Sequence, residues 1–132
     1  MKRIAILAAG VAVFGVACGS SGGTAGAPGV DRGKSVSAAS DADKSSLCDW
    51  FVPMVGGYGA APSCPDWLIG APADKADCTS NFPVCDVTVG ELEDCMVAIV
   101  AAQNTCTQQA LIAVQARPDC QAVIAGNCFG TP

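Results

Sequence analysis

The spacing of eight cysteines limits what this chain can fold into more than any other feature of its sequence. The eight are spread over the last two thirds of the chain, and no two of them are adjacent. No pair has the Cys-x-x-Cys spacing of zinc knuckles and thiol redox sites, and the chain contains no histidine. We therefore predict disulfides, no metal site and no cofactor. The eight residues are Cys48, Cys64, Cys78, Cys85, Cys95, Cys106, Cys120 and Cys128.

The side chains available for a core are mostly small. Hydrophobic residues make up 51% of the 132 residues, but aromatic residues make up only 5%. A domain of this size that buries so little area per residue is marginally stable without covalent cross-links. Because disulfides form and persist outside the cytosol, the composition predicts an exported domain that its cysteines hold together.

The N-terminus has the layout of an export signal, which we assign to residues 1–17. Lys2 and Arg3 supply the positive charge, and the uncharged apolar run Ile4 to Val16 is too short to span a bilayer. The sequence Gly-Val-Ala-Cys at 15–18 resembles the lipobox of bacterial lipoproteins, in which the cysteine is lipidated and becomes the mature N-terminus. The family has an aliphatic residue, usually Leu, where this chain has Gly15.

Cysteine parity favours lipidation of Cys18. The chain has nine cysteines, an odd number, and exported proteins seldom leave a thiol unpaired. Lipidation of Cys18 leaves an even set of eight. By the lipoprotein resemblance the chain is then anchored in the membrane, and Gly19 in place of Asp favours the outer membrane over the inner. The alternative is ordinary cleavage after Ala17, which releases a periplasmic or surface protein.

Residues 18–39 are expected to form a flexible linker, and residues 40–132 the folded domain. The stretch 19–29 is rich in Gly and Ser and has no apolar face to bury. We expect Asp31, Arg32 and Lys34 to be solvated.

The folded domain is predicted to be all-α, with about four short helices and one long disulfide-stapled loop. Ser40, Thr88 and Thr105 are each followed three residues later by an acidic residue or Gln, a pattern that indicates helix starts. Pro118 indicates a fourth start, and Gly126 its end. The expected helices cover about 41–52, 88–103, 105–117 and 118–126.

The loop, residues 56–87, contains at most one helical turn near 73–78, and Cys64, Cys78 and Cys85 fix its position. Short connections between the last three helices predict antiparallel hairpins. In that geometry Cys95 lies level with Cys120, and Cys106 with Cys128. We predict these two disulfides, which leaves three pairings for the other four cysteines.

Charge and composition exclude several functions. After residue 17 the chain has five Lys and Arg against twelve Asp and Glu, a net charge of −7, which argues against a nucleic-acid partner. Serine and cysteine nucleophiles usually need a histidine base, which is absent. Two-carboxylate chemistry would draw on Asp66, Asp74 and Asp77, or on Glu91, Glu93 and Asp94. Glu91 already caps a helix, and we place Glu93 and Asp94 on the solvated face of that helix. We therefore expect that the protein is not an enzyme.

Trp50, Tyr58 and Trp67 are candidate interface residues, because large aromatic side chains dominate binding energetics. The competing interpretation is that a core poor in aromatic residues uses them for packing, with Trp50 and Phe51 beneath the loop. We favour this second interpretation, since tryptophan is buried on average.

The chain resembles the small cysteine-rich lipoproteins of unknown function found in myxobacteria and related Gram-negative bacteria. The resemblance lies in the Gly/Ser tether, in Leu-Cys-Asp-Trp at 47–50 and in the run from Val84 to Cys95. It implies an envelope location and a stapled fold, but no activity. We expect a non-enzymatic binding or structural module with an unknown protein partner. The alternatives are a carrier of a small apolar ligand, and a secreted inhibitor or effector that presents the loop from Gly56 to Asp77.

Overall fold

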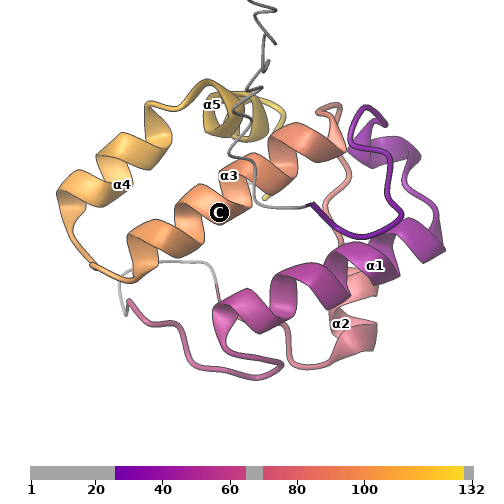
Figure 1. Ribbon diagram of the computed structural model, residues 1–132, viewed down its shortest axis with the longest axis horizontal. Coiled ribbons are helices and arrows are strands. Elements are labelled where there is room, and N and C mark those ends of the chain that lie inside the picture. Colours follow the sequence, from indigo (N-terminus) through magenta and orange to yellow (C-terminus); the bar gives the residue numbers. More distant parts are fainter. Residues whose placement is uncertain (1–25, 65–69, 130–132) are drawn as a thin grey trace, which may run out of the picture.

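The computed structural model describes residues 26–64 and 70–129, and all regular secondary structure within these ranges is helical. The prediction of a small all-α, disulfide-rich domain is confirmed. Four main helices are joined by a shorter one, α2, and by two 3-10 turns (Figure 1). The elements are η1 (Val36–Ala38), α1 (Asp41–Phe51), η2 (Val52–Val55), α2 (Lys75–Ser80), α3 (Val89–Gln103), α4 (Gln108–Gln115) and α5 (Pro118–Ala125).

Helix α3 is the centre of the fold. Both α4 and α5 pack on it, while α1 packs on α2 (Figure 1). Leu92, Cys95, Met96 and Ile99 recur at helical spacing along α3, and all four are buried. Most of the hydrophobic core therefore lies around this one helix.

Two of the predicted helix starts are confirmed as capping boxes. At α1 the Ser40 side chain accepts a hydrogen bond from the Asp43 amide, and the Asp43 carboxylate accepts one from the Ser40 amide. Thr88 and Glu91 form the same reciprocal pair at α3. Each box satisfies backbone N–H groups that a helix N-terminus leaves without a partner.

The predicted start at Thr105 is wrong by two residues. The N-cap of α4 is Thr107, whose side chain accepts a hydrogen bond from the Ala110 amide. Thr105 belongs to the turn after α3, where its hydroxyl donates to the Ala102 carbonyl. Cys106 then has a positive φ of 49°, which interrupts the helical path between the two threonines.

The eight cysteines form four disulfides: Cys48–Cys78, Cys64–Cys106, Cys85–Cys128 and Cys95–Cys120. The predicted pair Cys95–Cys120, which joins α3 to α5, is confirmed. The predicted pair Cys106–Cys128 is wrong. Cys106 follows the C-terminal end of α3. Cys128 is bonded to Cys85, which lies just before the N-terminal end of the same helix. The 15 residues of α3 separate those ends by about 22 Å.

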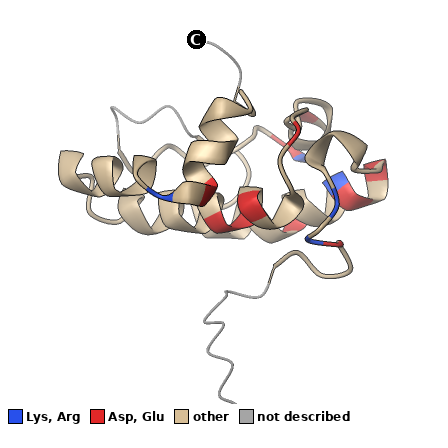
Figure 2. Cartoon of the chain, turned by 90° about the horizontal axis from the view of Figure 1, so that it is seen from above, with Lys and Arg blue, Asp and Glu red and all other residues tan. Residues whose placement is uncertain are grey.

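The wrong pair came from assuming that α4 and α5 form an antiparallel hairpin. Figure 1 shows α5 end-on while α3 and α4 lie along the page, and in Figure 2 the helix beside the C mark stands upright across the others. Arg117 has an extended backbone immediately before Pro118, and this redirects the chain. In this orientation Val123 is fully buried, whereas Ile124 is 55% exposed.

Residues 26–39, here called the N-terminal segment, are part of the folded domain. Val36 is 1% exposed, its amide donates to the Val87 carbonyl, and the Val89 amide donates to the Lys34 carbonyl. The segment thus runs antiparallel to the residues that lead into α3. The prediction of a flexible linker is wrong for these residues. Residues 1–25, which include the predicted signal peptide and Cys18, lie outside the described residues.

Four disulfides in so small a domain are typical of a protein that folds in an oxidising compartment outside the cytosol. Among the described residues, no helix combines the length and the apolar character needed to cross a bilayer.

Candidate functional site

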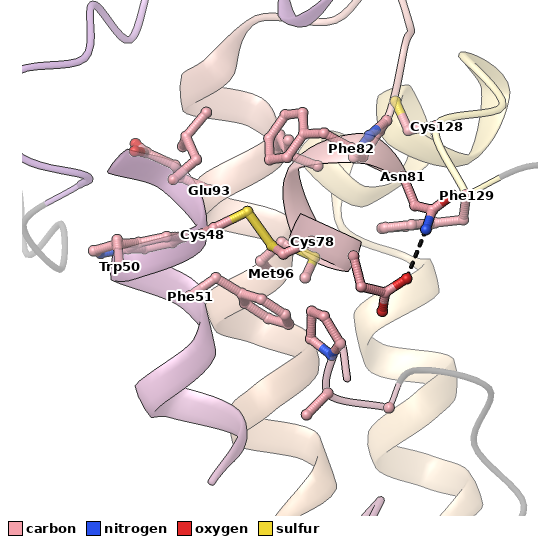
Figure 3. Close-up of a pocket in the computed structure, with 17 residues that line it drawn as sticks. Cys48, Trp50, Phe51, Cys78, Asn81, Phe82, Glu93, Met96, Cys128 and Phe129 are labelled. Atoms are coloured by element: carbon pink, nitrogen blue, oxygen red, sulfur yellow. Dashed lines mark hydrogen bonds between the residues drawn. A yellow bond between two sulfur atoms is a disulfide. The ribbon is translucent and has the colours of Figure 1, made fainter. Parts of the chain in front are cut away.

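An apolar cavity of about 460 Å³ lies between α1, α2 and α3 (Figure 3). The largest side chains that line it are aromatic or sulfur-containing, and they come from four separate parts of the chain. They are Trp50 and Phe51 of α1, Phe82 after α2, Met96 of α3 and Phe129 after α5.

Helical spacing and one disulfide position these walls. Leu47 and Phe51 are four residues apart on α1 and therefore share a face, which lines the cavity. Leu92 and Met96 do the same on α3. The Cys48–Cys78 disulfide ties α1 to α2 and is itself part of the lining. Two of the three helices around the cavity are thus covalently linked.

The polar side chains of the lining include Asp77 and Asn81. Asp77 lies on α2, and Asn81 follows the last residue of that helix, about one turn further along the chain. The Asp77 carboxylate accepts hydrogen bonds from Asn81 Nδ2 at 2.7 Å and from the Ala73 amide at 2.9 Å. Figure 3 marks the first of these bonds with a dashed line. Both donors are neutral, Asp77 is half-buried, and no ion pair between the residues that the structure describes involves it.

Glu93 also contributes to the lining, but its carboxylate is used elsewhere. The residue is 1% exposed, and its Oε1 accepts a hydrogen bond from the Ala27 amide at 2.6 Å. Its Oε2 lies 2.9 Å from Arg32 Nη1, a charge contact without hydrogen-bond geometry. Figure 3 shows this carboxylate pointing to the side opposite Phe82.

The expectation that Glu93 lies on a solvated helix face is wrong, because the N-terminal segment covers that face. The same segment removes Arg32 from its expected solvated role. Arg32 Nη2 donates to Asp94 Oδ1 at 2.7 Å, and this hydrogen bond raises the pKa of the guanidinium. Periodicity within α3 could not show this, since the covering residues lie far away in the sequence.

The other acidic candidates that the structure describes do not converge on a reaction centre. Glu91 Oε2 accepts from both the amide and the hydroxyl of Thr88. Asp74 caps α2 by accepting from the Asp77 amide. Asp66 lies outside the described residues. Within the described ranges, no three Asp, Glu or Cys side chains are close enough together to hold a metal ion.

Trp50 and Tyr58, the two predicted interface aromatics among the described residues, border different hollows. Trp50 is half-buried, packs against the core and lines the cavity. Tyr58 is 40% exposed and borders a separate hollow beside Pro53 and Gly57. Trp67 lies outside the described residues.

Sequence reasoning missed Phe82, Met96 and Phe129 as members of one site. Met96 recurs at helical spacing with other apolar residues of α3, but Phe82 and Phe129 follow the ends of helices and carry no periodic signal. The Cys85–Cys128 disulfide brings their two segments together. A correct pairing of these two cysteines would have been the one signal able to place both rings near the same cavity.

The chain was compared with protein-family models, curated proteins and solved structures. No protein-family model matches the chain, and neither a curated protein nor a solved structure is significantly similar to it.

Proposed function

We propose that this chain is an exported, non-enzymatic binding domain that holds a small apolar ligand in the cavity between α1, α2 and α3. The observation that carries the proposal is the cavity itself, with a volume of about 460 Å³ and a mainly apolar and aromatic lining. Cavities of roughly 300–1,000 Å³ with few polar groups are the usual form of small-molecule sites. Among the functions considered from the sequence, this supports the carrier of an apolar ligand.

The cavity weighs against a purely structural module. A domain whose only task is to present a rigid acidic surface gains stability from a filled core, and protein interiors are normally close-packed. Here four aromatic rings line a space that stays open while four disulfides supply cross-linking. Such an arrangement suits a protein that keeps a preformed site for a ligand.

Attachment to the outer membrane through a lipid on Cys18 is part of the proposal. The eight described cysteines pair with one another, so none of them is left as a disulfide partner for the ninth. Intact mass spectrometry of the membrane-extracted protein should show acyl chains on Cys18, and a Cys18→Ser variant should move to the soluble fraction. A mature chain that begins at an unmodified Cys18 would instead support the secreted alternative.

Ligand binding can be tested with an uncharged fluorescent probe such as N-phenyl-1-naphthylamine. We expect saturable binding at one site per molecule and a higher unfolding midpoint in the presence of the probe. Met96→Trp fills the cavity from α3 and should abolish binding. Because Met96 is buried and a larger side chain can strain the core, Ala71→Trp provides a second blocking variant at a half-buried lining position.

The matched control is Ile112→Trp, which adds the same side chain at a position of α4 that is 56% exposed and outside the cavity. It should leave probe binding unchanged. Binding that survives both blocking variants, or no binding by the unmodified protein, would contradict the proposed function.

A further inference from the structure

The charges around the cavity carry information about its ligand. The described residues contain five Lys and Arg, and Figure 2 shows how sparse these are beside the acidic residues. None of the five lines the cavity. Each is already in an ion pair: Arg32 with Glu93 and Asp94, Lys34 with Asp43, Lys44 with Asp41, Lys75 with Asp49, and Arg117 with Asp119.

Asp77 differs from these basic residues in its position and in its partners. It lines the cavity, and none of the ion pairs between described residues involves it. Its two oxygens each accept one hydrogen bond, from Asn81 and from the Ala73 amide. A carboxylate can accept about four hydrogen bonds, so Asp77 retains acceptor capacity toward a ligand. Glu93, the other acid of the lining, already has an ion-pair partner in Arg32.

The aromatic lining favours the same sign of charge. Trp50, Phe51, Phe82 and Phe129 present rings to the cavity, and the faces of such rings attract cations through their quadrupole. An anionic head group would lie beside these rings and the Asp77 carboxylate, and no Lys or Arg of the described residues lines the cavity to pair with it. A cationic head group would be attracted by the rings and by the carboxylate.

We infer that the ligand of this cavity is a hydrophobic cation, an apolar molecule with one positively charged nitrogen that lies beside Asp77. This inference rests on the proposed function and names the chemical class of the ligand. The apolar part of the ligand occupies the space between Phe51, Phe82 and Met96. Its charged nitrogen forms an ion pair with the Asp77 carboxylate. A fatty-acid anion binds the same site more weakly, because its carboxylate is repelled by Asp77.

Two amphiphiles with the same tail test the inference. Dodecyltrimethylammonium and dodecanoate are titrated against the protein loaded with the uncharged probe, at neutral pH and below their micelle concentrations, and dodecanol serves as the neutral reference. We expect the ammonium compound to displace the probe at a concentration about tenfold lower than dodecanoate does. The difference should shrink as salt is added, because Asp77 is only half-buried.

Substitutions separate the local charge from the overall acidity of the domain. Asp77→Asn removes one charge at the cavity and should abolish most of the preference for the cation. Asp86→Asn removes one charge from an exposed residue outside the cavity, whose carboxylate accepts from the Ser37 hydroxyl, and should leave the preference intact. Asn81→Lys places a base beside Asp77 and should shift the preference toward dodecanoate. It also provides an independent test if Asp77→Asn fails to fold.

The outcomes distinguish the two proposals. Probe binding with equal displacement by both amphiphiles, or with tighter binding of dodecanoate, overturns the inference about charge and leaves the proposed function standing. Equal loss of preference in Asp77→Asn and Asp86→Asn also overturns it, because the effect would then come from the net charge alone. Absence of saturable probe binding by the unmodified protein overturns the proposed function itself.

Discussion

Arg32 Nη1 lies 2.9 Å from Glu93 Oε2, and this contact joins the N-terminal segment to the central helix. The two side chains differ sharply in exposure: that of Glu93 is 1% exposed and that of Arg32 is 41% exposed. The buried carboxylate therefore depends on a partner that solvent can reach. Since Glu93 also lines the cavity, the covering of this residue links the N-terminal segment to the proposed binding site.

Arg32→Ala should destabilise the domain, because it leaves the Glu93 charge buried without a cation. Removing one partner of a buried pair typically costs about 3–5 kcal/mol, and we expect about 2 kcal/mol here because Arg32 is partly exposed and screened. Denaturant unfolding measures the loss. The double variant Arg32→Ala/Glu93→Gln should recover much of it. Arg117→Ala, which breaks an exposed pair with Asp119, is the control and should change stability by less than about 1 kcal/mol.

A chain that begins at Ser40 should be less stable than one that begins at Gly26. The shorter chain loses the buried Val36 side chain and both contacts of the Glu93 carboxylate. Burial of one valine and compensation of one charge together predict a loss of about 3 kcal/mol or more. The denaturation midpoints of the two chains measure this difference. Equal midpoints would restore the interpretation of residues 26–39 as a passive linker.

The sequence was most informative where structure is determined locally. The helix starts at Ser40, Thr88 and Pro118 depend on residues within one helical turn, and all three were predicted correctly. The pair Cys95–Cys120 was also predicted correctly, although the α4–α5 hairpin used to derive it does not form. The fold class follows from these local signals together with the cysteine pattern.

The sequence was least informative where distant segments meet. Burial of Glu93 depends on Ala27 and Arg32, and nothing within α3 indicates that a segment will cover this face. The cavity depends in the same way on Phe82 and Phe129, which the Cys85–Cys128 disulfide brings together. With eight cysteines, 105 pairings exist, so neither the cavity nor its lining could be derived without the correct one.

The N-cap of α4 gives a prediction that separates two neighbouring threonines. Thr107→Ala removes the side chain that accepts from the Ala110 amide, and should cost about 1 kcal/mol. Thr105→Ala removes only a hydroxyl that donates to the Ala102 carbonyl, and should cost less than half as much, since that carbonyl still accepts from the Thr105 and Cys106 amides. Thermal unfolding of both variants checks the order. A larger loss for Thr105→Ala would restore the start predicted from the sequence.

Stability should fall as the pH approaches 2. The Lys34 ammonium and the Ser40 amide, which both donate to the Asp43 carboxylate, lower the pKa of Asp43 from 3.8 to about 2. Because the folded pKa lies below the unfolded one, the stabilisation is complete above pH 3.8 and is lost as the pH falls through about 2. Asp43→Asn should be less stable than the unmodified chain at pH 7, with the difference vanishing near pH 2. Lys34→Met, which removes the largest cause of the shift, should show a weaker pH dependence in the same window.

The disulfides Cys64–Cys106 and Cys95–Cys120 should differ in what their removal disrupts. Cys95 and Cys120 are both buried and join the two core helices α3 and α5, so replacing both with Ala should cost about 2–5 kcal/mol and lower the unfolding midpoint of the whole domain. Cys64–Cys106 instead ties the long loop to the turn after α3. Its removal should leave the helical circular-dichroism signal intact while protease cleaves first within residues 56–74. Loss of helical signal in the Cys64→Ser/Cys106→Ser variant would show that the loop supports the core.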